Sequence, residues 1–345
     1  MSRVTMADVA RVAGVSKQTV SRIVNEKGEA SADTIRRVLE VIQELGYRPN
    51  GIARSLATRR TKTLGLVLSN LSNPYQAEIA EGAEATAAEL GYDLFMSNAF
   101  RNAEKQERAL EAFEHKSVDG VIVFKPRMPE ARLARLLGRH RGAVVIDRQV
   151  PHRIAGVIRT DLTVSMALAV EHLVRSGRQT IALFPGLGRS DISLALLDGF
   201  STGLATHGLA FDEAHVVRGQ TTVEAAMEAV IGFLPEHPEV DAIVCNNDVV
   251  AVGVLHGCRE LGRRVPEDIA VIGHGDMAYA RLVTPALTTL HVDRFEIGRN
   301  AVRMLIDRMA GRNLTTEIVI KPELVVRASA PGPEVAAIAV PAASA

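Results

Sequence analysis

The sequence predicts a small all-α head followed by an α/β core of two doubly wound lobes built on parallel sheets. Two patterns lead to this prediction. Before Pro49 apolar residues recur at the spacing of helices, and from Thr63 onward β-branched apolar runs alternate with helix-like segments. Such alternation is typical of βαβ units, in which helices cover both faces of a parallel sheet.

The head begins with two short helices joined by a tight turn. Thr5 can cap the first helix and Ser16 the second, and Gly14 allows the sharp turn between them. The outward face of the second helix carries hydrogen-bonding side chains and no carboxylate: Lys17, Gln18, Ser21, Arg22 and Asn25. This face fits the major groove of DNA, where Arg and Gln can read base edges. An ordinary helical hairpin with a solvated basic face is the alternative.

A third helix completes the head. Ser31 can cap it and Gly46 can end it. Its expected core stripe consists of Ile35, Val38, Leu39, Ile42 and Leu45. The segment from Asn50 to Ala57 is too short to hold as a helix alone in water, and a basic linker follows it up to Lys62.

The head is basic, whereas the rest of the chain is acidic. Residues 1–62 carry 12 Lys and Arg against 6 Asp and Glu, and the remainder carries 28 against 34. This asymmetry suits a polyanionic partner for the head only.

Composition places the chain among soluble proteins, with 47% hydrophobic and 23% charged residues. No window reaches the roughly 18 uninterrupted apolar residues of a membrane span, and the first residues lack the apolar core of a secretory signal. Cys245 and Cys258 are too few for a disulfide framework. We therefore expect a cytoplasmic protein.

The core contains two runs of four expected strands, at 64–69, 92–98, 119–124 and 143–147, then at 180–184, 214–217, 241–245 and 269–273. The stretch from Pro151 to Asp161 between them reads as an irregular joint. The tail from Ala328 has neither a helical nor a strand period and is expected to be disordered; it also lacks the leucine heptads of a coiled coil. The predicted domains are residues 1–49 (head), 50–62 (hinge helix and linker), 63–327 (core) and 328–345 (tail).

Open parallel sheets bind ligands beyond the carboxyl ends of their strands, and here those ends are polar. The candidate ligand-binding residues are Ser69, Asn70, Tyr75, Lys125, Asp147 and Arg148 in the first lobe and Arg189, Ser190, Asn247, Asp248, His274 and Asp276 in the second. Two such rows facing across a hinge would form a cleft for a small hydrophilic molecule. The alternative is that strand ends are polar because loops are exposed.

The run DVARVAGVSKQTVSRIVN closely resembles the DNA-binding headpiece of the LacI-type (lactose/purine repressor) transcriptional regulators. The resemblance continues through GYRPNGIARSLATRRTKTLGLVLSNLSNPY, CNNDVVAVGV and TPALTTL, and so covers the chain from Val4 to Arg327. It implies a repressor of a carbohydrate or sugar-acid operon that works as a homodimer on a palindromic operator and answers to a small-molecule effector. It also implies a core like that of type I periplasmic binding proteins, with crossings between lobes near Asp161, His291 and Lys321.

The resemblance assigns roles to residues of the head. By match to the recognition-helix positions, Lys17, Gln18 and Arg22 would contact bases. Contacts to DNA phosphates would come from Thr5, Ser16, Thr19, Ser21, Asn25, Ser31 and Thr34. In the hinge, Asn50 would cap a helix that forms on DNA, Ala53 would pack near the floor of the minor groove, and Leu56 would wedge into it.

Several effector positions depart from the family pattern. Leu196 replaces an arginine, Gly275 an aspartate, Thr221 a stacking aromatic and Val292 a glutamine. The remaining candidates include Lys125, Arg148, Arg189, His274 and Arg294, which favour a carboxylate or phosphate. The GHGD and LHVDRFEIG runs also resemble the gluconate-repressor branch. We therefore expect an acidic effector, such as a sugar acid or a sugar phosphate.

The sequence shows no catalytic motif and calls for no cofactor. It lacks the phosphate loop, the H-E-x-x-H pair and the G-x-S-x-G elbow, and the spacing of Cys245, His256 and Cys258 matches no zinc pattern, so no metal site is expected. A sugar-binding transport protein or a sugar-processing enzyme of similar α/β shape is the rival hypothesis. Transport predicts a signal peptide and no basic head, and an enzyme needs an acid/base or metal set.

Overall fold

A computed structural model describes residues 4–24, 30–47, 60–71, 73–186, 191–312 and 315–332. The head holds α1 (Met6–Ala13), α2 (Lys17–Val24) and α3 (Ala32–Leu45). Thr5 caps α1 through a capping box with Asp8, and Gly14 ends it with φ of 65°, in the left-handed region that favours glycine. These local signals were all visible in the sequence.

The three head helices share one core, which includes Val9, Val20 and Val38, each fully buried. The expected core stripe of α3 was wrong at Leu39, whose exposed fraction is 51%. Val41 is buried in its place, because it lies with Val38 and Leu45 on the inward stripe of the helix, whereas Leu39 is turned away.

The first lobe is a six-stranded sheet in the order β11-β5-β4-β3-β1-β2, with every neighbouring pair parallel. Its strands are β1 (Thr63–Leu68), β2 (Asp93–Asn98), β3 (Gly120–Phe124), β4 (Ala143–Ile146), β5 (Gly156–Thr160) and β11 (Glu317–Ile320). The helices are α5 (Pro74–Glu89), α6 (Ala103–His115), α7 (Glu130–Leu137) and α12 (Arg294–Met309). Alternate strand residues point to opposite faces, so α5 and α12 cover one face and α6 and α7 the other.

The second lobe repeats this plan in the order β12-β10-β9-β8-β6-β7, with β12 antiparallel. Its strands are β6 (Ile181–Gly186), β7 (Val216–Arg218), β8 (Ala242–Cys245), β9 (Ala270–Gly275), β10 (Thr288–His291) and β12 (Glu323–Val325). The helical elements are α8 (Leu162–Arg175), α9 (Asp191–Thr206), η1 (Glu213–His215), α10 (Val223–Phe233), α11 (Asp248–Glu260) and η2 (Ala278–Arg281). Helices α10 and α11 cover one face of this sheet, and α8 and α9 cover the other.

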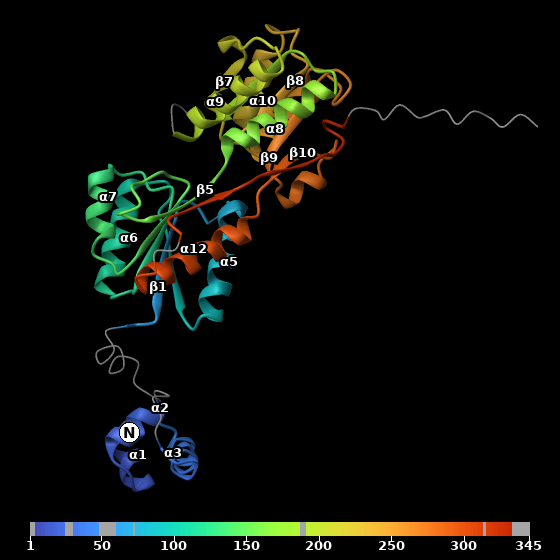
Figure 1. Cartoon of the computed structure of the whole chain (residues 1–345). Coiled ribbons are helices and arrows are strands. Elements are labelled where there is room, and N and C mark those ends of the chain that lie inside the picture. Colours follow the sequence, from blue (N-terminus) through green and yellow to red (C-terminus); the bar gives the residue numbers. More distant parts are fainter. Residues whose placement is uncertain are drawn as a thin grey trace, which may run out of the picture.

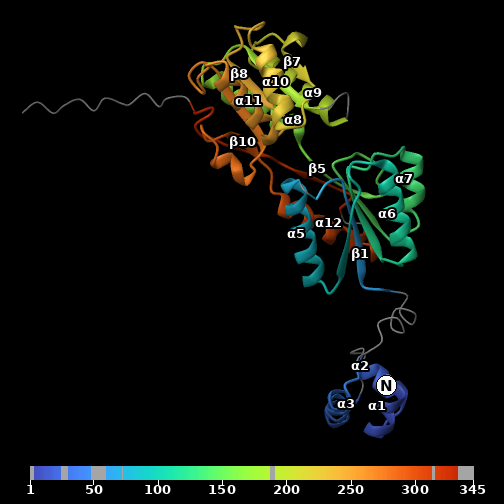
Figure 2. The ribbon, with the colours of Figure 1, turned by 180° about the vertical axis from the view of Figure 1, so that it is seen from behind.

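The chain passes between the lobes three times, as Figures 1 and 2 show. It leaves the first sheet after β5, returns between β10 and α12, and crosses once more between β11 and β12, near Lys321. Consequently α12, late in the sequence, lies beside α5 of the first lobe in both views. These crossings fall where the family resemblance placed them.

Four strands were not predicted. The expected irregular joint before Asp161 contains β5, and β10, β11 and β12 also lie outside the two runs of four. Each is only three to five residues long. Such short segments depend on neighbouring strands for their hydrogen bonds, so their own sequences carry a weak signal.

The start of the tail also differs from expectation. Residues 328–332 are ordered against the second lobe. The Ser329 hydroxyl donates to the Val271 carbonyl at 2.6 Å and accepts from the Thr288 amide at 2.8 Å, and both Ser329 and Ala330 are buried. The prediction of disorder from Ala328 is therefore wrong for this segment. Single hydrogen bonds to residues of β9 and β10 hold it, and such contacts leave no periodic pattern in the sequence.

Candidate DNA-binding helix and effector cleft

Helix α2 presents the predicted base-contacting residues to solvent. Lys17, Gln18 and Arg22 are exposed, whereas Val20 and Ile23 of the same helix are buried against α1 and α3. The helix is thus anchored by one face and offers donors on the other, which is the arrangement that a major-groove reader requires.

Hydroxyl pairs mark the starts of the head helices. Ser16 accepts from the Thr19 amide at 3.0 Å, and Ser31 accepts from the Thr34 amide at 3.3 Å. The two hydroxyls of each pair lie 2.9 Å apart. Helix N-termini favour phosphate because their amide groups and dipole point at it, so these positions suit the predicted backbone contacts.

Thr5 is held differently from these pairs. Its hydroxyl donates to Asp8 Oδ2 at 2.7 Å, and the hydrogen bonds from Thr5 lower the pKa of Asp8. A phosphate contact would require this hydroxyl to turn away from the carboxylate.

Some predicted residues lie outside the described part of the chain. They are Asn25 in the head, Asn50, Ala53 and Leu56 in the hinge, and Arg189 and Ser190 in the second lobe. Ser21 is described and is half-buried on α2.

In the first lobe, the strand ends bring Lys125 and Asp147 together. Lys125 Nζ lies 3.5 Å from Asp147 Oδ2, and both residues have positive φ, at 43° and 55°. Such backbone conformations are uncommon for residues other than glycine and gather at functional sites. Tyr75, from the first turn of α5, packs on Phe124 with ring centroids 6.2 Å apart. Burial and the charge of Asp147 raise the pKa of Tyr75, so its phenol stays protonated.

Other first-lobe candidates hold the protein itself together. Arg148 Nη1 donates to the carbonyls of Pro126 and Met128 at 2.7 and 2.6 Å. Ser69 is buried, and the amides of Ser69 and Asn70 both donate to Gln76 Oε1. We therefore omit Arg148 from the ligand set and regard Ser69 and Asn70 as a loop that α5 fixes.

In the second lobe, Asp248 is buried beneath the strand ends. Its carboxylate accepts from the Met277 amide and from the Thr289 hydroxyl, each at 2.6 Å, while burial raises the pKa of the carboxyl. Asn247 caps α11 through the Val250 amide at 3.0 Å. Asp248 and Asn247 thus bond other residues of the second lobe, and we regard them as residues that fix the loops at these strand ends.

His274 is a buried histidine at the end of β9. Burial, together with the charges of Lys125 and Arg294 from the first lobe, lowers the pKa of His274 to about 4. Its Nε2 lies 3.2 Å from Ser165 Oγ, and that hydroxyl donates to the Asp161 carbonyl. The Nε2 atom therefore carries the proton and donates to the serine, so this ring is neutral near pH 7 and adds no positive charge to the cleft.

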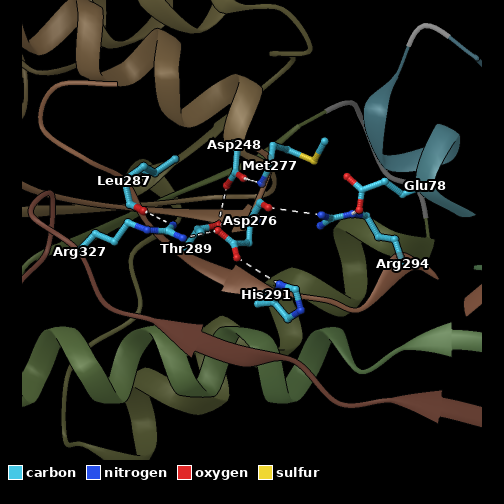
Figure 3. A network of polar contacts seen from close by, with 9 residues as sticks. All are labelled: Glu78, Asp248, Asp276, Met277, Leu287, Thr289, His291, Arg294 and Arg327. Carbon is cyan, nitrogen blue, oxygen red and sulfur yellow. Dashed lines mark hydrogen bonds and ion pairs between the residues drawn. The ribbon is translucent and has the colours of Figure 1, made fainter. Parts of the chain in front are cut away.

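Asp276 is the centre of a polar network that joins the two lobes (Figure 3). Its carboxylate contacts Arg327 at 2.7 Å and His291 at 3.2 Å. Its carbonyl accepts from Arg294 Nη2 at 3.3 Å, and Arg294 Nε donates to Glu78 of α5 at 2.8 Å. The network thus runs from α5 of the first lobe to Arg327, just after β12 of the second lobe.

Glu78, His291 and Arg327 were absent from the predicted site. His291 is the last residue of β10 and Arg327 lies just after β12, the short strands that the sequence did not reveal, and Glu78 lies in the interior of α5. Strand ends can be inspected for polar residues only when the strands themselves are recognised.

Arg294 has an unused donor. The residue is 5% exposed, and its Nη1 has no hydrogen-bond partner within the described residues. Its guanidinium carbon lies 5.9 Å from the centre of the Tyr75 ring. A buried guanidinium N–H is costly to leave unpaired, which indicates a place for an acceptor from a ligand or water.

The departures from the family pattern are also visible. Leu196, which stands where many relatives have an arginine, is 1% exposed and packs in the core with Phe200. Cys245 and Cys258 are buried as well, and burial raises the pKa of the Cys258 thiol to about 12. Both thiols pack in the core, as expected from their apolar surroundings.

A helix-turn-helix head on a hinged two-lobed core defines a DNA-binding regulator controlled by a small molecule. Comparison with known proteins agrees. Residues 5–50 match the bacterial regulatory proteins of the lacI family, and residues 170–330 match the periplasmic binding protein-like domain.

Full-length relatives cover both parts. The transcriptional repressor PurR of Erwinia tasmaniensis is 35% identical over 95% of this chain and 98% of its own length. Catabolite control protein A of Priestia megaterium is 33% identical over 92% and 96%. The solved structure of the Lac repressor dimer bound to operator and an anti-inducer is similar with a TM-score of 0.83, at 26% identity, over 96% of this chain and all of that one.

The chain belongs to the LacI family of transcriptional regulators. It is a DNA-binding regulator and not an enzyme, since the relatives that it matches along nearly their whole length include the transcriptional repressor PurR. This overturns the rival hypothesis of a transport protein or a sugar-processing enzyme. Among the described helices, none combines the length and apolar character needed to span a bilayer.

Proposed function

We propose that this regulator is a homodimeric repressor of a carbohydrate or sugar-acid operon and that its effector is a small hydroxylated acid. The observation that carries the effector class is the buried Arg294 Nη1, which has no partner in the described chain and lies beside Tyr75. A carboxylate is the acceptor that a guanidinium fork binds best.

The cleft is not cationic throughout. Lys125 pairs with Asp147, Arg294 with Glu78 and Arg327 with Asp276, and His274 is neutral. The proposal of an acidic effector therefore depends on Arg294 Nη1, the donor that has no partner among the described residues. Carboxylates such as Asp147 and Asp276 accept hydrogen bonds from hydroxyl groups, so a sugar acid fits this mixed surface better than a simple dianion.

The position of Arg294 between the two lobes suggests how an effector would control the protein. The Arg294 side chain bonds Glu78 of the first lobe and the Asp276 carbonyl of the second. An acid bound at Nη1 would change the charge balance at this link and with it the relative positions of the lobes. The gluconate-like GHGD and LHVDRFEIG runs contain His274, Asp276 and Arg294, which supports a sugar acid.

On DNA, Lys17, Gln18 and Arg22 are the proposed base readers. The proposed phosphate contacts are Thr5, Ser16, Thr19, Ser21, Asn25, Ser31 and Thr34, and the proposed minor-groove hinge residues are Asn50, Ala53 and Leu56. Support comes from the exposure of the α2 readers and from the hydroxyl pairs at the helix starts. The regulator would work in the cytoplasm, where bacterial DNA lies.

Homodimer formation has support from the edge of the first sheet. Strand β2 is the outermost strand of that sheet, and its Phe95 and Met96 are 43% and 48% exposed. An edge strand that pairs on one side only and carries exposed large apolar side chains is a surface that another copy can cover. Two heads on a symmetric dimer would read a palindromic operator.

Two measurements on the purified full-length protein test this function. Genome-wide footprinting should reveal palindromic sites beside genes of sugar-acid or carbohydrate metabolism. Calorimetry with a panel of sugar acids, sugar phosphates and neutral sugars should show binding of an acid. Binding of neutral sugars alone would overturn the effector class, and equal affinity for palindromic and scrambled duplexes would overturn the operator proposal.

A further inference from the structure

The second lobe contains a cluster of metal-ligating side chains away from the strand ends that form the cleft. His215 ends η1 just before β7, and His237 and Glu239 lie in the connection between α10 and β8. Figure 1 labels β7 and α10 in this lobe. His215 and Glu239 are 24 residues apart in the chain, a spacing that matches no metal-binding sequence motif.

The distances in this cluster are those of a coordination site. His215 Nε2 lies 3.1 Å and His237 Nδ1 lies 3.4 Å from the same atom, Glu239 Oε1. One ligand atom from each residue lies within 4.8 Å of the others. Two ligand atoms at about 2.1 Å from a tetrahedral zinc ion are roughly 3.4 Å apart, so a small adjustment would place all three around one ion.

The backbone holds the three residues in place. Asp212 caps η1 through the Ala214 amide at 2.9 Å, which fixes the turn that carries His215. The His237 amide donates to the Phe233 carbonyl at 3.1 Å, and Pro238 stands between the other two ligands and restricts the backbone there. These backbone contacts therefore bring the three side chains close together before any ion binds.

Aromatic packing also sets the orientation of the rings. The His237 ring stacks on the Phe233 ring, with centroids 4.5 Å apart. The Phe233 ring in turn packs in an edge-to-face arrangement on Phe184, a buried residue of β6. The rings of His215 and His237 lie nearly perpendicular, with centroids 5.3 Å apart. Pre-oriented imidazoles lose little freedom when they bind an ion.

We propose that His215, His237 and Glu239 bind a divalent transition-metal ion, with Zn²⁺ as the expected occupant. Two imidazoles and one carboxylate are ligands of zinc sites that keep a fourth position for water. The side chains of His215, His237 and Glu239 are 15%, 23% and 50% exposed, so an ion can enter from solvent. The ion would tie the short edge strand β7 to the connection that follows α10.

The test uses the full-length protein after treatment with a chelator. Calorimetry with ZnCl₂ should show one more site per chain in the wild type than in Glu239→Gln or His237→Gln. Loss of a direct ligand should weaken this site by about 100-fold or more, since even outer partners contribute roughly 10–100-fold. With CoCl₂, the wild type should give visible absorption of a low-coordinate ion that ZnCl₂ abolishes.

His256→Gln is the matched control, because His256 is exposed on α11 and is no member of the cluster. It should bind Zn²⁺ as the wild type does. A second readout is the melting temperature, which Zn²⁺ should raise in the wild type and in the control but not in the cluster variants. Equal Zn²⁺ stoichiometry in the wild type and both cluster variants would overturn the proposal, as would an equal loss in His256→Gln.

Discussion

His274 shows how burial can reverse an inference drawn from residue type. In the sequence it counted toward a cationic cleft, yet burial and the facing charges of Lys125 and Arg294 lower its pKa to about 4. The ordinary value of 6.5 applies in the unfolded chain. Below pH 6.5 the unfolded state therefore binds a proton that the folded state refuses, and stability falls as the pH drops from about 6.5 to about 4.

This difference can be measured by denaturant unfolding at pH 8 and pH 5. Between pH 8 and pH 5 the free energy of unfolding should fall by about 2 kcal/mol more in the wild type than in His274→Gln, because the pKa of His274 differs between the folded and unfolded states. Gln keeps an N–H that can reach Ser165 Oγ, so the variant should fold. His256→Gln, on the exposed side of α11, should behave as the wild type. Identical pH dependence in wild type and His274→Gln would show that this ring titrates normally.

Arg22 is the residue for which a DNA role makes the sharpest prediction. It is exposed on α2, whose opposite face is buried. If its guanidinium reads a base edge, Arg22→Ala should cost about 1–3 kcal/mol on the cognate operator and relax base preference at one position. Arg135→Ala removes the same charge from an exposed site on α7 and should leave operator affinity unchanged. An equal loss on cognate and random duplexes would assign Arg22 to the phosphate backbone instead.

Among the elements, the crossing of α5 and α12 depends on two glycines. A Cβ on Gly298 would lie 2.0 Å from the Ile79 carbonyl oxygen, and one on Gly82 would lie 2.1 Å from the Phe295 carbonyl oxygen. Both obstacles are backbone atoms, which cannot move aside as a flexible side chain can. The helices therefore pack with their backbones in close contact, and α12 is held against α5.

Gly298→Ala should consequently destabilise the first lobe by about 1–3 kcal/mol, the usual cost of overpacking, although alanine favours helices. Gly232→Ala is the matched control. It changes an exposed glycine of α10 with no atom within 4 Å of the added Cβ, and it should be neutral or stabilise by up to about 1 kcal/mol. Thermal and denaturant unfolding give both values. A Gly298→Ala protein as stable as the wild type would mean that the helices can separate without loss.

For the molecule as a whole, the sequence was sufficient where the signal is local. Caps at Thr5 and Ser31, the turn at Gly14 and the long buried strands all leave patterns in neighbouring residues. The short strands β5, β10, β11 and β12 do not, because their partners are distant in the chain. The same reason explains which residues of the site could be predicted. Lys125 and Asp276 follow strands that the sequence revealed. Arg327 contacts Asp276 because β12 pairs with β10, and the sequence revealed neither of these strands.

Effector control is the prediction at the scale of the whole molecule. Arg294 connects Glu78 of the first lobe to Asp276 of the second, and its Nη1 has no partner among the residues that the structure describes. Coupling between effector and operator is typically about 1–3 kcal/mol and is the same in both directions. In Arg294→Gln, the sugar acid identified by calorimetry should bind at least tenfold more weakly, because a hydrogen bond to a charged group contributes about 1.5–3 kcal/mol.

In Arg294→Gln, the sugar acid should also change operator affinity much less than it does in the wild type. Arg299→Gln, on the solvent side of the same helix and paired with Glu296 at 2.8 Å, should keep the response. Measuring operator affinity with and without the acid in all three proteins separates binding from coupling. If Arg294→Gln bound the acid as tightly as the wild type but no longer transmitted the effect, the guanidinium would act as a link between the lobes rather than as an anion anchor. Full retention of both binding and response would contradict either role, and the acid would then have to be held elsewhere in the cleft.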